Sequence, residues 1–197
     1  RFENIQYLDF GGGLNPKPRK QEATDIKVVG ESLAQMLASF KHPSGVDLHL
    51  RFEPGRFLVG EAGTLYVETT ILKQNGDVQF AGVDSGFNHL IRPMFYDSHH
   101  TIENLSNPNA ELEQYTVVGN LCEVDNFAKG RRIPKLREGD ILAIKDAGAY
   151  GFSMSSQYNS RPRPAEVLLD GPDVTVIRER EGLADMLRNQ VVRKLTN

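Results

Sequence analysis

The sequence has little cysteine, no long apolar run and no strong charge of either sign. Its 197 residues contain one cysteine, Cys122, which cannot form an internal disulfide; this favours a reducing compartment, and we expect a cytoplasmic protein. No segment approaches the roughly 18 consecutive apolar residues that span a bilayer. The net charge of -3 lacks the basic surplus typical of nucleic-acid binding. We therefore expect neither membrane nor nucleic acid as a partner.

Motifs for metals and nucleotides are also missing. The sequence has no CxxC or HExxH motif, and the adjacent pair His99–His100 lacks the i, i+4 spacing of zinc ligands on a helix. We expect this pair in a solvated loop and predict no metal site. The triplet Gly11–Gly13 lacks the downstream residues of a dinucleotide fingerprint or a P-loop.

The first 60 residues have the pattern of a βαβ unit. Residues 6–10 and 46–52 are typical of strands. Between them, a helix capped by Thr24 or Asp25 is predicted from apolar residues at helical spacing: Ile26, Val29, Leu33, Leu37 and Phe40. Such a unit implies parallel strands. Because two strands and one helix cannot close an α/β layer, we expect further sequence upstream.

The remainder is mostly β-forming. Strands are predicted at 64–73, 78–83, 115–119, 141–146, 165–169 and 174–178, with turns at Asn75–Asp77 and Asp170–Asp173. A terminal helix is expected over residues 182–193, with Leu183, Met186, Leu187 and Val191 on one face. The expected organisation is an α/β segment over residues 1–60 and a mostly antiparallel β domain, a barrel or a sandwich, over residues 61–197.

Two candidate sites lie at the predicted strand ends of the first segment. Gly11–Gly13 can offer backbone N–H groups to an anion, although a plain turn is the alternative. Glu53 and Arg56 follow the second strand, on the side where α/β folds bind ligands. Glu53 can accept a proton from a ring nitrogen and Arg56 can bind a carboxylate or phosphate; a surface ion pair beside a turn is the alternative.

Further candidates lie in the β-rich part. Arg92 and Tyr96 are close in sequence, and Cys122 and Glu123 place a thiol beside a carboxylate. A free thiol, with a pKa of about 8.5, can act as an acid near neutrality, although a lone cysteine can equally be an inert core residue. Tyr150 offers a hydroxyl among small residues, or else fills a core. The charged runs Arg161–Arg163 and Arg178–Glu181 are expected to be solvated.

The order and spacing of these motifs carry a resemblance. Five blocks contribute to it: Leu8–Gly13, Glu53–Arg56, Gly82–Tyr96, Val118–Asp125 and Asp146–Asn159. Together they resemble the fold type III decarboxylases that depend on pyridoxal 5'-phosphate (PLP), and within these the diaminopimelate decarboxylase family, over nearly the whole chain.

The resemblance implies a fold and a reaction. Residues 1–60 would be the last part of a PLP-binding (β/α)8 barrel and residues 61–197 the C-terminal β domain. The implied reaction is decarboxylation of meso-2,6-diaminopimelate to L-lysine and CO2, the last step of lysine biosynthesis. The family also implies a homodimer whose active site is shared across the interface, with a small amino-acid substrate.

The resemblance assigns roles residue by residue. The implied cofactor-binding residues are Gly11, Gly12, Gly13, Glu53, Gly55, Arg56 and Tyr150. The implied substrate-binding residues are Arg56, Arg92, Tyr96, Glu123 and Tyr150. Glu53 would pair with the pyridine nitrogen and Glu123 with the distal ammonium. Cys122 would be the proton donor, entering with Glu123 from the neighbouring subunit.

Two departures from the family accompany these roles. The lysine that forms the Schiff base with the cofactor and the histidine that stacks on it lie upstream in the family, so we expect the 197 residues alone to be inactive. Residues 15–20 also differ from the family's usual apolar-Pro-Tyr continuation. Alternatives to the diaminopimelate reaction are another amino acid or a carrier-bound substrate in the same superfamily, or a non-catalytic homologue that serves as a binding partner.

Overall fold

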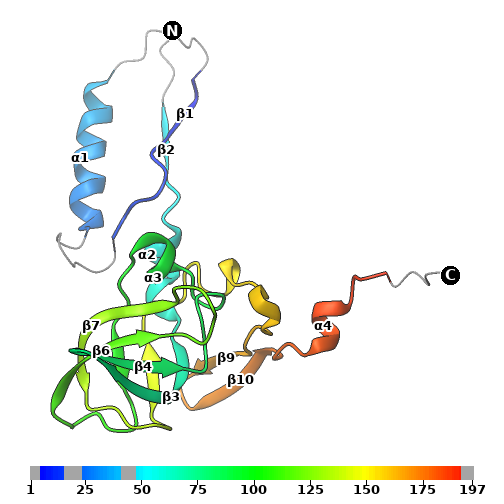
Figure 1. Ribbon diagram of the computed structural model, residues 1–197. Helices are drawn as coiled ribbons and strands as arrows, with labels where there is room; N and C mark the ends of the chain where they lie inside the picture. The colour runs from blue at the N-terminus through cyan, green and yellow to red at the C-terminus, as the bar shows by residue number, and fades with distance from the viewer. Residues whose placement is uncertain (1–4, 16–23, 41–47, 192–197) are drawn as a thin grey trace.

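The computed structural model describes residues 5–15, 24–40 and 48–191. Its first part, the N-terminal unit, comprises strand β1 (Tyr7–Asp9), helix α1 (Ile26–Ser39) and strand β2 (His49–Arg51), and it projects from the rest of the molecule (Figure 1). β1 and β2 pair in parallel, with Leu8 opposite Leu50. The predicted βαβ pattern is thus confirmed. Residues 46 and 47 of the second predicted strand, and residues 16–20 of the divergent loop, lie outside the described residues.

α1 begins where the sequence predicts. The Asp25 side chain accepts a hydrogen bond from the backbone N–H of Lys27 at 2.9 Å, which satisfies a donor that the first turn leaves free. Val29, Leu33 and Leu37 are half-buried, so the expected apolar face exists. None of the side chains of α1 is fully buried, however. The helix is capped by its own sequence but is not enclosed by the described part of the chain.

The second part, the sheet unit, is a six-stranded sheet in the order β5-β8-β3-β4-β6-β7. Its strands are β3 (Leu65–Asn75), β4 (Val78–Val83), β5 (Ile102–Asn104), β6 (Leu112–Val118), β7 (Asn126–Pro134) and β8 (Ile141–Ile144). Every pairing is antiparallel except that of β4 with β6. The Asn104 amide donates to the Lys135 carbonyl at 3.2 Å, which draws the two edge strands together and nearly closes the sheet. The expected mostly antiparallel domain is confirmed.

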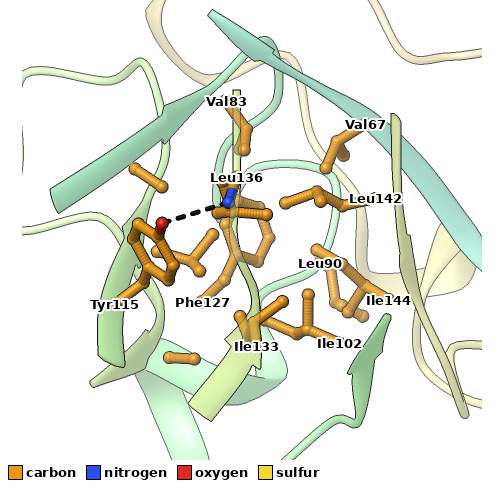
Figure 2. Close-up of a cluster of buried hydrophobic side chains, with 13 residues drawn as sticks. Val67, Val83, Leu90, Ile102, Tyr115, Phe127, Ile133, Leu136, Leu142 and Ile144 are labelled. Atoms are coloured by element: carbon orange, nitrogen blue, oxygen red, sulfur yellow. Dashed lines mark hydrogen bonds between the residues drawn. The ribbon is translucent and has the colours of Figure 1, made fainter. Parts of the chain in front are cut away.

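One hydrophobic core lies inside this sheet (Figure 2). Its largest member, Tyr115, is 1% exposed. The Tyr115 hydroxyl donates to Glu113 at 2.7 Å and accepts from the backbone N–H of Leu136 at 3.0 Å, so its polar end is satisfied in the interior. Leu142 and Ile144 of β8 are fully buried against it. The packed core therefore holds the strands in fixed positions, and the loops extend from the ends of these strands.

Short elements connect and follow the sheet. They are α2 (Gly55–Val59), η1 (Gly60–Ala62), α3 (Arg92–Tyr96), η2 (Phe152–Met154), η3 (Tyr158–Ser160), β9 (Glu166–Asp170), β10 (Asp173–Arg178) and α4 (Leu183–Leu187). β9 and β10 form the predicted hairpin, whose turn has Gly171 at φ +57°. No helix in the described residues has both the length and the apolar character to cross a membrane.

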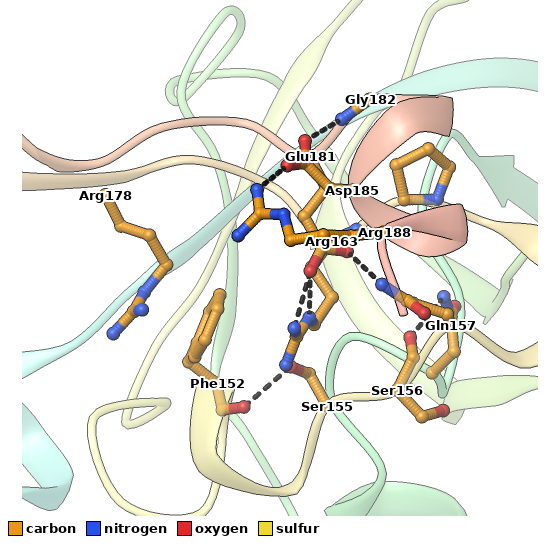
Figure 3. Close-up of polar contacts among 12 residues, drawn as sticks. Phe152, Ser155, Ser156, Gln157, Arg163, Arg178, Glu181, Gly182, Asp185 and Arg188 are labelled. Atoms are coloured by element: carbon orange, nitrogen blue, oxygen red, sulfur yellow. Dashed lines mark hydrogen bonds and ion pairs between the residues drawn. The ribbon is translucent and has the colours of Figure 1, made fainter. Parts of the chain in front are cut away.

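Three expectations about the surface are wrong. Among the described residues the terminal helix covers Leu183–Leu187, shorter than predicted, and Leu183 on its predicted apolar face is 65% exposed; residues 192 and 193 lie outside the described residues. His100 is buried instead of solvated, since its Nδ1 bonds to the Lys145 carbonyl at 2.8 Å. Arg163 and Glu181 are not free surface charges: Arg163 Nε donates to Glu181 at 2.8 Å (Figure 3).

Candidate functional site

The glycine turn after β1 is held against the end of β2. Gly11 and Gly13 have φ of +66° and +83°, a region that favours glycine. The backbone N–H of Gly11 donates to Asp9 Oδ1 at 2.8 Å, and the N–H of Glu53 donates to the Gly11 carbonyl at 2.7 Å. A Cβ on Gly12 would lie 2.6 Å from the Glu53 carbonyl oxygen. The turn therefore favours glycine, and it lies beside Glu53.

An arginine cluster, formed by Arg56, Arg92, Tyr96 and Tyr150, lies between α2 and α3. The Arg92 guanidinium carbon is 5.6 Å from the Tyr96 ring centre and 5.3 Å from that of Tyr150, within cation–π range. Arg92 Nη2 also donates to Ser98 Oγ at 3.1 Å. Burial lowers the pKa of Arg92, and the positive charge of Arg56 lowers it further. Two guanidinium groups kept close together in this way favour an anion between them.

Tyr150 reaches this cluster through a tightly packed turn. Gly148 donates its N–H to the Gly60 carbonyl at 3.0 Å, and a Cβ on Gly148 would lie 2.0 Å from the Val59 carbonyl oxygen. Tyr150 itself has φ +59°, uncommon for a residue with a side chain. A Cβ on Gly55 would lie 3.4 Å from the Tyr150 hydroxyl. The turn thus sets the hydroxyl against the start of α2, and the alternative of a core tyrosine is wrong because Tyr150 is 43% exposed.

An open cavity of about 1130 Å³ adjoins the arginine cluster. Arg56, Arg92 and Tyr96 line it together with Arg131 of β7. Burial lowers the pKa of Arg131, while the nearby Asp97 raises it. From the sequence, Arg131 and Arg132 are expected to be surface charges, and Ser98, which bonds to Arg92, is not a candidate. Strand pairing brings Arg131 to the cavity and a turn brings Ser98 to Arg92, so no local motif marks either residue.

The thiol loop, Gly119–Asp125, is organised around a buried carboxylate. Asp125 is 5% exposed, and its two oxygens accept from the backbone N–H of Phe87 at 2.7 Å and of Leu121 at 3.2 Å. A Cβ on Gly119 would lie 2.0 Å from Asp125 Oδ2. Burial raises the pKa of Asp125, whereas the two N–H donors lower it. Asp125 was not among the candidates from sequence, yet it determines the shape of the loop.

Cys122 and Glu123 sit exposed at the tip of the thiol loop. Cys122 is a free, exposed thiol, so the alternative of an inert core cysteine is wrong. The Tyr158 hydroxyl donates to Glu123 Oε1 at 3.0 Å, and this hydrogen bond raises the pKa of Tyr158. Asn159 Nδ2 donates to Cys122 Sγ at 3.2 Å. The loop thus presents a thiol and a carboxyl group side by side, and each is hydrogen-bonded to η3.

Cys122 and Glu123 make no hydrogen bond to the arginine cluster among the described residues, although Val124 of the thiol loop lines the same cavity as Arg92. Among the described residues, the hydrogen bonds of Cys122 and Glu123 go to η3, and none reaches Arg92 or Tyr150. The contacts of Arg92 are with Ser98 and the two tyrosines. The chain therefore carries two polar groups of residues, and each has its own hydrogen-bond partners. In the described residues no group of three or more His, Cys, Asp or Glu is arranged to hold a metal ion.

The sequence of the sheet unit and its loops matches a known protein family. Residues 14–148 match the profile of the family described as "Pyridoxal-dependent decarboxylase, C-terminal sheet domain", and the chain belongs to this family.

Within the family, one enzyme recurs among the relatives. The chain is 45% identical to the diaminopimelate decarboxylase of Methanothermobacter thermautotrophicus, over 95% of this chain and 45% of that protein. It is similar to the crystal structure of diaminopimelate decarboxylase from M. jannaschii, with a TM-score of 0.86 and 35% identity over 96% of this chain and 44% of that one. For the Helicobacter pylori enzyme complexed with L-lysine the TM-score is 0.81, at 34% identity over 94% and 44% of the two chains. The chain thus spans about half the length of these relatives.

The residues present fit the phosphate of the family's cofactor. The glycine turn has no Cβ to obstruct an approaching anion, and Gly11 and Gly13 would meet nothing within 4 Å on that side. Among the described residues, the N–H groups of Gly12 and Gly13 have no protein acceptor. Such groups are suited to an anion. The neighbouring Glu53 adds a carboxylate that can face a protonated ring nitrogen.

Proposed function

We propose that this chain supplies the phosphate-binding turn and the substrate-recognition groups of a PLP-dependent diaminopimelate decarboxylase. The reaction removes one carboxylate from meso-2,6-diaminopimelate and yields L-lysine and CO2, the last step of lysine biosynthesis. One observation carries the proposal: the chain holds a paired guanidinium cluster at Arg56 and Arg92 and, separately, a thiol next to a carboxylate at Cys122 and Glu123. A substrate with an amino-acid group at each end requires both.

The cofactor-binding roles fall on the first cluster and the glycine turn. Gly11, Gly12 and Gly13 bind the phosphate through backbone N–H groups, and Glu53 pairs with the ring nitrogen and keeps it protonated. Gly55 and Arg56 complete this stretch, where a Cβ on Gly55 would come into contact with the Tyr150 hydroxyl. PLP, when bound, supplies an electron sink for the charge left by the departing carboxylate.

The substrate-binding roles use charge complementarity. Arg56 and Arg92 bind carboxylate, with Tyr96 beside Arg92, and Tyr150 contacts both substrate and cofactor. Glu123 binds the distal ammonium. Cys122 Sγ gives its proton to the substrate carbon that has lost CO2, which fixes that carbon as the CH2 of lysine.

The assembly follows from the separation of the two clusters. We propose that residues 1–60 form the last part of a (β/α)8 barrel, that residues 61–197 form the β domain, and that the protein is a homodimer. In it, Cys122 and Glu123 of one subunit complete the arginine cluster of the other. Two features support this: among the described residues Cys122 and Glu123 make no hydrogen bond to Arg92, and Gly60 is the first buried residue in the described chain. The expected cytoplasmic location stays a prediction.

The substrate is tested in the whole protein that contains this chain, loaded with PLP. Release of CO2 is measured from meso-diaminopimelate and, in parallel, from L-lysine and L-ornithine, which lack the distal carboxylate. We expect turnover of the first alone. Arg92→Ala should raise KM for meso-diaminopimelate by about tenfold or more because a charged hydrogen-bonding partner is lost. Cys122→Ala should lower kcat by about 10²- to 10³-fold, the usual contribution of a general acid.

The controls separate the alternatives. Leu58→Ala, an exposed neighbour of Arg56 on α2 that does not line the cavity, should leave both constants within about twofold. Preferred turnover of L-ornithine would assign the protein to another amino acid. Absence of turnover across a broad substrate panel, in a folded protein with PLP bound, would instead identify a non-catalytic homologue.

A further inference from the structure

Element η3 meets the thiol loop residue by residue. Tyr158 donates to Glu123 and the next residue, Asn159, donates to Cys122 Sγ at 3.2 Å. Among the described residues, Asn159 is the hydrogen-bond donor that contacts this sulfur. The thiol and the carboxylate therefore each have a separate partner, on adjacent residues of one turn.

The backbone of η3 is held in an uncommon conformation. Asn159 and Ser160 have φ of 55° and 54°, and non-glycine residues adopt this region only where surrounding structure determines it. The turn closes with the N–H of Arg161 on the Tyr158 carbonyl at 3.3 Å. It is anchored to the core through Ser156, whose N–H donates to the carbonyl of the buried Asn88 at 2.8 Å. The Asn159 amide is thus directed at the sulfur by a supported turn.

Proton donation by Cys122 would be favoured by the hydrogen bond from Asn159 to Sγ. When Cys122 acts as the acid, its S–H bond breaks, a C–H bond forms on the decarboxylated carbon, and the negative charge passes to Sγ. An N–H donor binds a neutral thiol weakly and a thiolate more strongly, because hydrogen bonds to charged groups are stronger. A donor at Sγ therefore stabilises the state after proton transfer more than the state before it, which is the condition for accelerating the step.

We propose that Asn159 is a positioning residue for proton donation: its side-chain amide orients Cys122 Sγ and stabilises the thiolate that the transfer leaves. The proposal rests on the proposed role of Cys122. The proposal gives the two side chains of η3 different roles. Asn159 acts on the thiol, and Tyr158 acts on Glu123, the residue proposed to bind the distal ammonium. The two side chains are accordingly expected to affect different kinetic constants.

The test compares two variants in the whole protein. Asn159→Gly removes the donor while keeping a residue that tolerates positive φ, and Asn159→Asp keeps the shape but replaces the donor with an anion. The reaction of Cys122 with iodoacetamide is followed against pH by mass spectrometry of the peptide, with Cys122→Ala as the blank. We expect the midpoint of the alkylation profile to rise by about half to one pH unit in Asn159→Gly and further in Asn159→Asp.

Steady-state kinetics supply the second measurement. Asn159→Gly should lower kcat by about three- to tenfold with KM within about twofold. Tyr158→Phe is the matched control: it should raise KM while leaving the alkylation midpoint within about 0.2 pH units. An unchanged midpoint in both folded Asn159 variants would overturn the proposal. If the wild-type protein releases no CO2, the proposed function fails, whereas the alkylation profiles still decide whether Asn159 acts on the thiol.

Discussion

The sheet unit and the N-terminal unit differ in what they do with their apolar side chains. The sheet unit buries a continuous cluster of apolar side chains that includes Tyr115 and Leu142, which are 1% and 0% exposed. In the N-terminal unit no described residue is fully buried, and Met36 and Phe40 are 60% and 53% exposed. Isolated helices of this length are marginal in water, and most helical stability comes from tertiary packing. The contrast indicates a self-sufficient sheet and a βαβ unit that depends on surfaces beyond it, as the proposed barrel would provide.

The largest expected effect compares one truncation in each unit. In the 197-residue chain, Leu142→Ala should lower the free energy of unfolding by about 2–5 kcal/mol, because it leaves a cavity in a packed core. Met36→Ala on α1 should change it by less than about 0.5 kcal/mol. Urea unfolding followed by circular dichroism measures both. Equal destabilisation by the two variants would contradict the comparison and show that α1 belongs to the cooperative core.

The same contrast explains which elements the sequence predicts. α1 was predicted because its cap and apolar spacing are local, and β3 and β4 because a turn joins two β-forming runs. β7 was missed since Lys129, Arg131 and Arg132 interrupt its apolar pattern; the strand forms because its backbone pairs with β6. β5 is three residues long and exists through pairing with β8. Local signals therefore predict the N-terminal unit well and the sheet edges poorly.

The next effect concerns two aspartates that each hold a backbone turn, one per unit. Asp125→Asn replaces one of two accepting oxygens with an NH2 group, so the buried N–H of Phe87 or Leu121 loses its partner. We expect a loss of about 1–3 kcal/mol in unfolding free energy and faster alkylation of Cys122 as the thiol loop loosens. Asp9→Asn, which keeps the single acceptor needed by Gly11 in an exposed turn, should change stability by less than about 0.5 kcal/mol.

That result would be contradicted by equal stability of the two asparagine variants. The unfolding free energy of both variants and the alkylation rate of Cys122 are measured in the same samples. Together they show whether the Asp125 carboxylate holds the thiol loop in place or whether the loop keeps its conformation without it.

In the candidate site, as in the fold, the residues found from sequence are those that lie in local motifs. The glycine turn, Arg92 and the pair Cys122–Glu123 were predicted because each lies in a short, distinctive motif. Asp125 and Asn159 were not assigned roles, because their importance appears only when the loop of one motif folds onto residues 37 or 38 positions away. Sequence motifs therefore indicate candidate site residues, while the residues that hold those candidates in place are found from tertiary contacts.

The smallest expected effect is electrostatic and lies in the segment after the sheet. The Arg163 guanidinium, ahead of all other causes, lowers the pKa of Glu181 from its ordinary value of 4.5 to about 2 (Figure 3). A carboxyl whose pKa is lower in the folded state stabilises the fold above about pH 4.5, and this contribution is lost as the pH falls from there toward 2. After allowance for solvent screening we expect about 1 kcal/mol. Glu181→Gln should therefore reduce the unfolding free energy by that amount at pH 7 and by progressively less between pH 4.5 and 2.

Glu166→Gln, in the more exposed pair with Arg178, should have a weaker effect at every pH. Urea unfolding at stepped pH measures both variants, and a pH-independent difference between wild type and Glu181→Gln would show that the side chain acts through packing instead of charge.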